Sequence, residues 1–284
     1  EGPIEPDRRI FFAKMVAGVS AVSAAGFGAL AVPKALCNAF VQRVDVTLAK
    51  LPKALDGFKI AQLTDLHIGM SLGGDWLKEI VRKTNALKPD LIVITGDMID
   101  GPPERIFAEV EPFKGLSAPH GVFYVTGNHE YYSEILDWMP LFEEMGLKVL
   151  HNERVSIGRG ADVFDLAGID DFRAATMEPT HGPDLETALR GRDRSRELVL
   201  LAHQPKAVFD AENHDVGLQI SGHTHGGQLW PFNHLVHLAQ PYSRGLNRHS
   251  ERTQIYVSEG TGFWGPPMRA GTKSEITLLK LHSA

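Results

Sequence analysis

The sequence predicts one α/β domain of layered β-sheets flanked by helices, preceded by a single apolar helix. Short runs rich in Val and Ile alternate with stretches of helical periodicity, which is typical of sheets covered by helices. Beyond residue 41 the chain has no internal repeat, no low-complexity linker and no second change of composition. We therefore separate an N-terminal segment, residues 1–40, from one continuous domain, residues 41–284.

The composition restricts the classes of function. Of the 284 residues, 43% are hydrophobic and 23% are charged, which is ordinary for a globular chain with a core. A formal net charge of -6 argues against nucleic-acid binding, which normally uses clustered Lys and Arg, so we expect a small-molecule or lipid substrate. The single cysteine, Cys37, cannot form an intramolecular disulfide or a thiolate site. Any metal must therefore be bound by nitrogen and oxygen ligands.

The N-terminal segment contains an uncharged run, residues 15–32, that follows Arg8, Arg9 and Lys14. Its length approaches the roughly 20 residues that a helix needs to cross a bilayer. Three interpretations remain open: a membrane anchor, a twin-arginine-type export signal cleaved after residues 29–31, or a helix packed on the domain. The missing polar face disfavours the third, and a start at Glu1, which allows for upstream sequence, disfavours the signal. If the segment inserts, its basic flank places its start on the cytoplasmic side.

Polar residues follow five apolar runs, at residues 59–64, 91–95, 122–126, 198–202 and 216–221. The ligand site of an open α/β sheet lies beyond the carboxyl ends of its strands, so these residues are expected to converge. Further strands are predicted at residues 163–167, 255–257 and 276–281, and helices over 76–87 and 135–142, which is enough for two sheets packed face to face. The candidate metal ligands at these strand ends are Asp65, His67, Asp97, Asn128, His203, His223 and His225.

Each candidate ligand alone has an ordinary structural explanation. Asp97 and Asn128 follow glycines and are suited to turns, and His203 beside an apolar strand could be a structural histidine. Together, seven oxygen and nitrogen ligands suit two divalent ions such as Mn, Fe or Zn better than Ca or Mg. Two ions about 3.5 to 4 Å apart need a shared carboxylate, and they can activate water against a phosphoryl group.

The motifs that contain these residues resemble those of the calcineurin-like metallophosphoesterase family, in order from about residue 44 to residue 281. They are Asp65-Leu66-His67, Gly96-Asp97-Met98-Ile99-Asp100, Gly127-Asn128-His129-Glu130, Ala202-His203-Gln204-Pro205 and Gly222-His223-Thr224-His225-Gly226-Gly227-Gln228. The resemblance implies a four-layer sandwich of two mixed β-sheets flanked by helices.

The same resemblance assigns roles to the site residues. It implies one metal on Asp65, His67, Asp97 and His225, and a second on Asp97, Asn128, His203 and His223, with Asp97 as the bridge. His129 would contact the phosphate or assist the leaving group, and Asp100 would orient His129. The alternative for Asp100 is a helix cap or turn residue.

We expect a dinuclear hydrolase of phosphodiester or pyrophosphate bonds that uses in-line attack by a metal-bridging hydroxide. Asp100 is followed by Gly101-Pro102-Pro103 rather than by the Asp-Arg-Gly of protein phosphatases. The chain thus resembles membrane-associated or exported bacterial phosphodiesterases, some of which hydrolyse UDP-2,3-diacylglucosamine. The resemblance implies a lipid-linked substrate and a bacterial cell membrane, with the domain on the non-cytoplasmic side. The alternatives are a non-catalytic metal-binding scaffold, a phosphodiesterase of soluble substrates and a hydrolase of non-phosphate esters.

The sequence leaves the roles of three further features open. The apolar loop 229–238 is expected to line an acyl-chain pocket, to rest on the bilayer, or to be a structural Ω-loop. Four arginines could recognise a second phosphate, although solvated arginines are the default: Arg173, Arg244, Arg248 and Arg269. Four histidines match no ligand motif and are expected to have no special role: His120, His151, His181 and His214.

Overall fold

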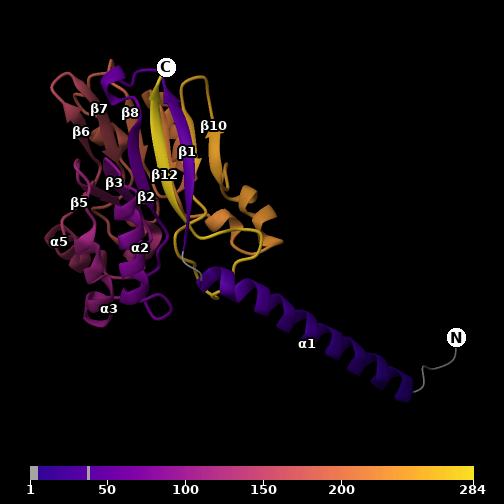
Figure 1. Ribbon diagram of the computed structural model, residues 1–284. Coiled ribbons are helices and arrows are strands. Elements are labelled where there is room, and N and C mark those ends of the chain that lie inside the picture. The colour runs from indigo at the N-terminus through magenta and orange to yellow at the C-terminus, as the bar shows by residue number, and fades with distance from the viewer. Residues whose placement is uncertain (1–5, 37–38) are drawn as a thin grey trace.

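The computed structural model describes residues 6–36 and 39–284 (Figure 1), so Cys37 lies outside the described residues. The strands are β1 Phe40–Leu48, β2 Phe58–Leu63, β3 Leu91–Thr95, β4 Val122–Val125, β5 Leu147–Val149, β6 Glu153–Arg159, β7 Asp162–Gly168, β8 Leu198–Leu201, β9 Leu218–Ser221, β10 Gly245–Arg248, β11 Gln254–Val257 and β12 Glu275–Ser283. The α-helices are α1 Pro6–Leu36, α2 Gly74–Ala86, α3 Pro103–Val110, α4 Asn128–Tyr132, α5 Ile135–Glu144, α6 Ala174–Met177, α7 Leu185–Ala188 and α8 Val208–Ala211. Short 3-10 helices are η1 Lys53–Leu55, η2 Glu111–Gly115, η3 Pro205–Ala207, η4 Glu212–His214, η5 His225–Gly227, η6 Phe232–His234 and η7 Val236–Leu238.

Two six-stranded mixed sheets form the centre of the domain, in the orders β1-β12-β2-β3-β4-β5 and β10-β11-β9-β8-β7-β6. The eight predicted strands correspond to β2, β3, β4, β7, β8, β9, β11 and β12, and the two predicted helices to α2 and α5. Strands β1, β5, β6 and β10 and helices α3, α4, α6, α7 and α8 were not predicted. The two mixed sheets flanked by helices confirm the predicted fold class.

Three apolar clusters separate the layers. One lies between the sheets and contains Val93, Phe164 and Leu201 from strands of both. A second packs α2, α3 and α5 on the outer face of the first sheet, where Trp138 and Phe142 are fully buried. A third covers the outer face of the second sheet with α7 and the segment around η3 and α8. The buried runs of Val, Ile and Leu in the central strands reflect burial on both faces.

The strand directions bring the functional loops to one end of the domain. In the first sheet β2, β3 and β4 are parallel, whereas β12 is antiparallel to β2, and β1 is parallel to β12. In the second sheet β7, β8, β9 and β11 are parallel. The carboxyl ends of β2, β3 and β4 therefore lie at the same end of the sheet as the start of β1, which follows α1 in the chain.

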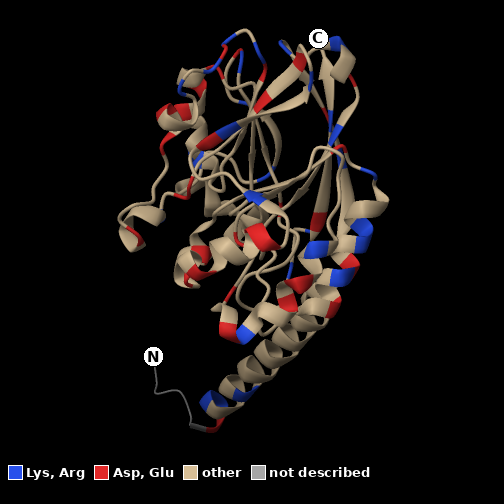
Figure 2. Cartoon of the chain, turned by 90° about the vertical axis from the view of Figure 1, so that its left-hand side faces the viewer, with Lys and Arg blue, Asp and Glu red and all other residues tan. Residues whose placement is uncertain are grey.

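Helix α1 projects away from the domain (Figure 1), and its middle carries no charged residue (Figure 2). Residues 7–36 are long and apolar enough to cross a membrane: an 18-residue stretch within them has a mean hydropathy of 1.8, and only 6% of that stretch is buried. The last turns do contact the domain, since Ala31 and Ala35 are buried and the Arg269 N–H donates to the Ala31 carbonyl at 3.0 Å. The interpretation of a helix packed along the domain is therefore wrong for most of α1.

Candidate metal centre

The structure brings all seven candidate ligands together at the strand ends. Asp65 and His67 follow β2, Asp97 follows β3, and Asn128 begins α4 directly after β4. From the second sheet, His203 follows β8, and the pair His223 and His225 follows β9. Most of these side chains are buried, and His223 is partly exposed. Both sheets thus contribute to one polar site.

The donor atoms of the seven candidate ligands form two groups that Asp97 connects, and a third group joins His129 to His67 and Asp97. Donor atoms of Asp65, His67 and His225 lie within 4.8 Å of one another, as do those of Asp97, His203 and His223. Asp97 Oδ2 lies 3.2 Å from His203 Nε2 and 3.8 Å from His67 Nε2, so it faces both groups. A carboxylate shared between two ions must face both groups of ligands in this way.

The residues present fit a pair of divalent cations. Asn128 Oδ1 is buried and has no hydrogen-bond partner among the described residues. His67 Nε2 and His225 Nε2 face each other at 3.2 Å. Buried carboxylates and imidazole lone pairs aimed at one point are costly unless a cation or donor occupies it. Five ring and amide donors with two carboxylates match the preference of borderline divalent ions.

Hydrogen bonds on the far side of two rings fix which nitrogen faces the site. His203 Nδ1 lies 2.8 Å from the Thr95 carbonyl, which can only accept, so this nitrogen carries the proton. His67 Nδ1 lies 3.1 Å from Asp100 Oδ1, and we assign its proton in the same way. Because each Nδ1 carries a proton, Nε2 is the ring nitrogen that a metal ion would bind.

The site also favours positive charge beside Asp97. Burial lowers the pKa of His223 to about 3 and that of His225 well below its usual value, so both rings are neutral. Burial would also lower the pKa of His203, but the adjacent Asp97 raises it well above its usual value. In turn His203 holds the pKa of Asp97 well below the usual range, although burial opposes this. A bound cation would supply the same charge.

The backbone at the ligands is strained. Five of the seven adopt positive φ: Asp65, His67, Asp97, His223 and His225. Such angles are uncommon for residues with a side chain, but Asp, Asn and His tolerate them best. At Gly222 a Cβ atom would collide with the Asp65 carboxylate, which explains why only glycine fits before His223. Strain of this kind is characteristic of functional sites.

His129 and Asp100 form a hydrogen-bonded unit beside the donor groups. His129 Nδ1 lies 2.6 Å from Asp100 Oδ1, the same oxygen that contacts His67. Burial would lower the pKa of His129, yet the bond to Asp100 and the charge of Asp97 raise it. The two histidine rings together hold the pKa of Asp100 below its usual value despite its burial. Asp100 is not the cap of α3, since Pro102 occupies that position without a side-chain bond.

Sequence reasoning assigned no role to Glu130, which organises the loops that carry the site. Its buried carboxylate accepts hydrogen bonds from the backbone N–H of Asp97 at 3.0 Å, Met98 at 2.6 Å and Gly127 at 2.7 Å. Burial and the nearby Asp97 raise the pKa of Glu130 to about 7. Its place as the last residue of the Gly-Asn-His-Glu motif was the signal that could have identified it.

The arginines expected to be solvated divide into two kinds. Arg173, Arg244 and Arg248 are exposed. Arg269 is fully buried, so the solvated default is wrong there, and it donates to the carbonyls of Glu259 and Gly262 and lies 3.4 Å from His225 Nδ1. Burial lowers the pKa of Arg269 to about 10, which leaves it charged at neutral pH. It braces the loops around the centre rather than offering a second phosphate site.

A second histidine–carboxylate group, His151 with Asp170 and His181, also has donor atoms within 4.8 Å of one another. We call these three residues the peripheral cluster. His151 Nδ1 lies 2.7 Å from Asp170 Oδ1, the Gly182 N–H donates to Asp170 Oδ2 at 3.0 Å, and His181 Nδ1 lies 3.0 Å from the Tyr131 hydroxyl. The donors of this cluster are thus already engaged with protein groups.

Comparison with known proteins identifies the class to which this fold and site belong. A family model described as calcineurin-like phosphoesterase matches residues 58–227, which include all seven candidate ligands, His129 and Asp100. The chain belongs to this family, as its motifs indicated.

Individual relatives extend the match over most of the chain. A transmembrane protein with a metallophosphoesterase domain from Danio rerio is 40% identical over 85% of this chain and 57% of its own length. Metallophosphoesterases that carry no assigned function are 41% identical in Helicobacter pylori, over 85% of this chain and 63% of the relative, and 33% identical in Bacillus subtilis, over 82% of both. The chain thus spans about three fifths of the first two relatives.

Proposed function

We propose that this chain is a dinuclear metal-dependent hydrolase of phosphodiester or pyrophosphate bonds. The observation that carries the proposal is the position of Asp97, which faces both donor groups while its Oδ1 accepts a hydrogen bond from the His129 N–H at 2.9 Å. One ion would be held by Asp65, His67, Asp97 and His225, and the other by Asp97, Asn128, His203 and His223. When bound, such a pair of Mn, Fe or Zn ions supplies an activated water and neutralises charge on the phosphoryl group.

The protein groups beside the ions complete the chemistry. Because Asp100 engages His129 Nδ1, the other ring nitrogen of His129 is free to donate to a phosphoryl oxygen or to the leaving-group oxygen. The raised pKa of His129 favours the protonated, donating form. A fixed donor at the place where charge develops stabilises the transition state without reorganisation.

We further propose that the substrate is lipid-linked, and membrane association of the chain supports this. Helix α1 meets the length and composition of a membrane span, and the Danio rerio relative is named as a transmembrane protein. The buried Ala31 favours an anchor over a cleaved signal, and if the helix inserts, Arg8, Arg9 and Lys14 favour a start of α1 on the cytoplasmic side. We propose a bacterial cell membrane, with the domain on its non-cytoplasmic side and UDP-2,3-diacylglucosamine-like pyrophosphates within the substrate class.

Hydrolysis of bis-p-nitrophenyl phosphate by Mn-loaded protein tests the proposal. We expect turnover that inorganic phosphate inhibits competitively, with metal content measured on the same sample. Absence of turnover across several phosphoesters by metal-loaded protein would favour a non-catalytic scaffold. A substrate panel then distinguishes a lipid-linked from a soluble substrate. It contains UDP-2,3-diacylglucosamine, an isoprenyl pyrophosphate and simple diesters, and preference for soluble diesters contradicts a lipid-linked substrate.

A further inference from the structure

The metal centre and the last turns of α1 lie at the same end of the domain. Asp65, Asp97 and Asn128 follow the carboxyl ends of β2, β3 and β4, and β1 starts at this end because it runs opposite to them. The chain therefore leaves α1 close to the loops that surround the site (Figure 1). If α1 spans a bilayer, the domain presents this end to the membrane.

Five of the large apolar side chains exposed at this end lie on two adjoining loops. We call them the apolar collar: Trp230, Phe232, Leu235, Leu238 and Trp264. Each is more than half exposed, from 56% for Leu235 and Trp264 to 86% for Leu238. Exposed apolar residues that occur singly need no explanation, but a group of five on two adjoining loops indicates an interaction surface.

Backbone contacts join the collar to the end of α1. Trp230 N–H donates to the Ala270 carbonyl at 2.9 Å, and Leu229 forms a β-bridge with Ala270. The preceding residue, Arg269, donates its backbone N–H to the Ala31 carbonyl of α1. The loop of η6 and η7 lies beside this end of the helix, on the side toward which α1 projects (Figure 1). Few residues therefore separate the collar from the point where α1 leaves the domain.

The collar also borders the metal centre. The rings of Trp264 and His129 meet edge to face, with centroids 6.1 Å apart. Gln228, which follows the last candidate ligand by three residues, binds Trp264 twice: its amide donates to the Trp264 carbonyl at 2.7 Å, and its Oε1 accepts from the Trp264 N–H at 3.0 Å. The same apolar surface thus extends from the end of α1 to the mouth of the site.

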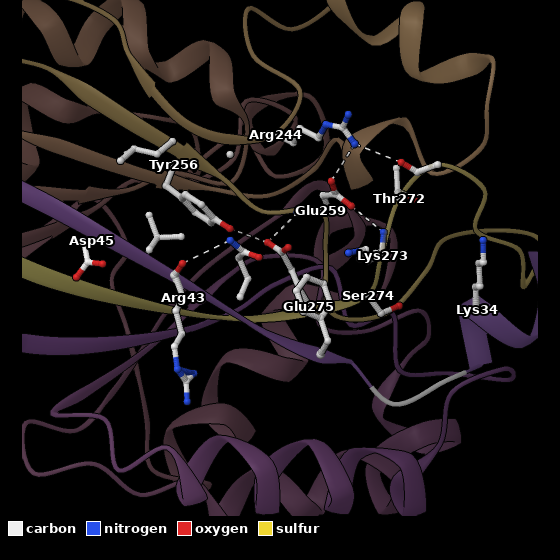
Figure 3. A pocket seen from close by; sticks show the side chains of 16 residues that line it. Lys34, Arg43, Asp45, Arg244, Tyr256, Glu259, Thr272, Lys273, Ser274 and Glu275 are labelled. Atoms are coloured by element: carbon white, nitrogen blue, oxygen red, sulfur yellow. Dashed lines mark hydrogen bonds and ion pairs between the residues drawn. The ribbon is translucent and has the colours of Figure 1, made fainter.

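A groove of mixed charge lies near the end of α1. A cavity of about 1330 Å³ opens between β1 and β10 (Figure 3), and its charged lining consists of Lys34, Arg43, Arg244 and Lys273 with Asp45, Glu259 and Glu275. Arg244 is paired with Glu259 at 3.1 Å. Within the part of the chain that the structure describes, neither Lys34 nor Lys273 has a carboxylate within 4.0 Å. Cations of this kind beside an apolar surface are suited to the headgroup region of a bilayer.

We propose that the apolar collar is seated in the surface of the bilayer that α1 enters, so that the metal centre opens onto the lipid headgroups. Trp and Leu favour this interfacial depth, where an apolar ring or chain is buried and polar loops stay hydrated. The proposal that the collar docks on the bilayer depends only on the positions of α1 and the apolar collar. Its consequence for catalysis rests on the proposed function: the substrate is an amphiphilic phosphoester presented at that surface, and Trp264 contacts the part of it that adjoins the scissile phosphate.

Fluorescence quenching by brominated lipids tests the docking. The full chain is reconstituted into phosphatidylcholine vesicles whose acyl chains are brominated either near the headgroup or near the methyl end. We expect strong quenching by the shallow bromines, and loss of most of it in Trp230→Phe with Trp264→Phe. Trp76→Phe is the matched control, since Trp76 packs against the core of the domain and should leave quenching unchanged. Quenching that persists without the two collar tryptophans, or none in wild type, overturns the proposal.

Paired variants then test the consequence for catalysis. Leu235→Ser with Leu238→Ser should lower turnover of a phosphoester lipid in vesicles by about tenfold, because partition of the site to the surface weakens. Turnover of bis-p-nitrophenyl phosphate should not change. Leu136→Ser, at a leucine on α5 that is 53% exposed, is the control. Equal loss on both substrates contradicts the proposed role of the collar. If wild type hydrolyses neither substrate, the proposed function fails, and the quenching result still decides the docking.

Discussion

The candidate metal centre and the peripheral cluster contain the same types of side chain, but they differ in whether the donor atoms already have protein partners. In the peripheral cluster Asp170 accepts from His151 and Gly182, and His181 contacts a tyrosine hydroxyl. In the metal centre Asn128 Oδ1 has no partner among the described residues, and two imidazole Nε2 atoms face each other. Proximity of histidines and carboxylates is therefore weak evidence for a metal. Whether the donor and acceptor atoms of these side chains already have protein partners is the stronger criterion.

The largest effect is expected from Asp97→Asn. Loss of the shared carboxylate removes one ligand from each ion, so metal content should fall below two per chain and kcat by on the order of 10³-fold or more. Inductively coupled plasma mass spectrometry on the assayed sample measures the ions. His151→Gln is the matched control and should retain both metal and turnover. If His151→Gln instead loses an ion, the distinction between the two clusters is wrong.

His129→Gln should lower kcat by about 10²-fold or more, because a donor to the phosphoryl or leaving-group oxygen is lost. Metal content should stay at the wild-type level, since His129 is not one of the seven candidate ligands, although one of its ring nitrogens lies within 4.8 Å of donor atoms of His67 and Asp97. Steady-state kinetics together with metal analysis measures both. A drop in metal content that matches the drop in kcat would make His129 a ligand.

Asp100→Asn should have a smaller effect, about 10-fold to 100-fold on activity or metal affinity, as is usual for a group that orients ligands. Asp100 raises the pKa of His129, so its replacement should lower that pKa. The protonated ring would then be lost at lower pH, and the alkaline limb of the kcat profile should move toward neutrality. An unchanged profile would show that Asp100 does not act through His129.

The smallest effect is expected at the peripheral cluster. Burial and the charge of His151 lower the pKa of His181. A lowered pKa contributes stability that is present above the unfolded value, about 6.5, and is lost as pH falls toward the folded value. In His181→Gln the free energy of unfolding in urea should be about 1 kcal/mol lower at neutral pH and should decrease less on acidification. An equally steep decrease in the variant would assign the acid sensitivity to other groups.

The strand ends were predictable, but the loops between them were not. Buried central strands such as β3 have continuous Val and Ile runs, and polar residues mark where each run ends. The edge strand β1, with the sequence FVQRVDVTL, has mixed exposure and pairs with the distant β12. Its polar residues interrupt the apolar pattern by which a strand would be recognised. Strand β10 and α3 are short and depend on tertiary packing rather than on local pattern.

Within the site, side-chain types were easier to predict than their partners. Asp100 was expected to orient His129, but its contact with His67 depends on the approach of two loops from different strands. Glu130 and Arg269 act on backbone groups that are close only in the folded chain. Arg269 in particular lies in a stretch without periodicity, and nothing in its neighbours distinguishes it from a surface arginine.

The positive φ angles of the ligands limit how this centre could change its metal preference during evolution. Asp65, His67, Asp97, His223 and His225 each combine a donor atom with a left-handed turn, so replacements there must suit both. Among residues with donor side chains, Asn, Asp and His tolerate that conformation best. Asn128 and His203 have no such backbone constraint. Divergence in metal choice among related chains should therefore be concentrated at these two positions.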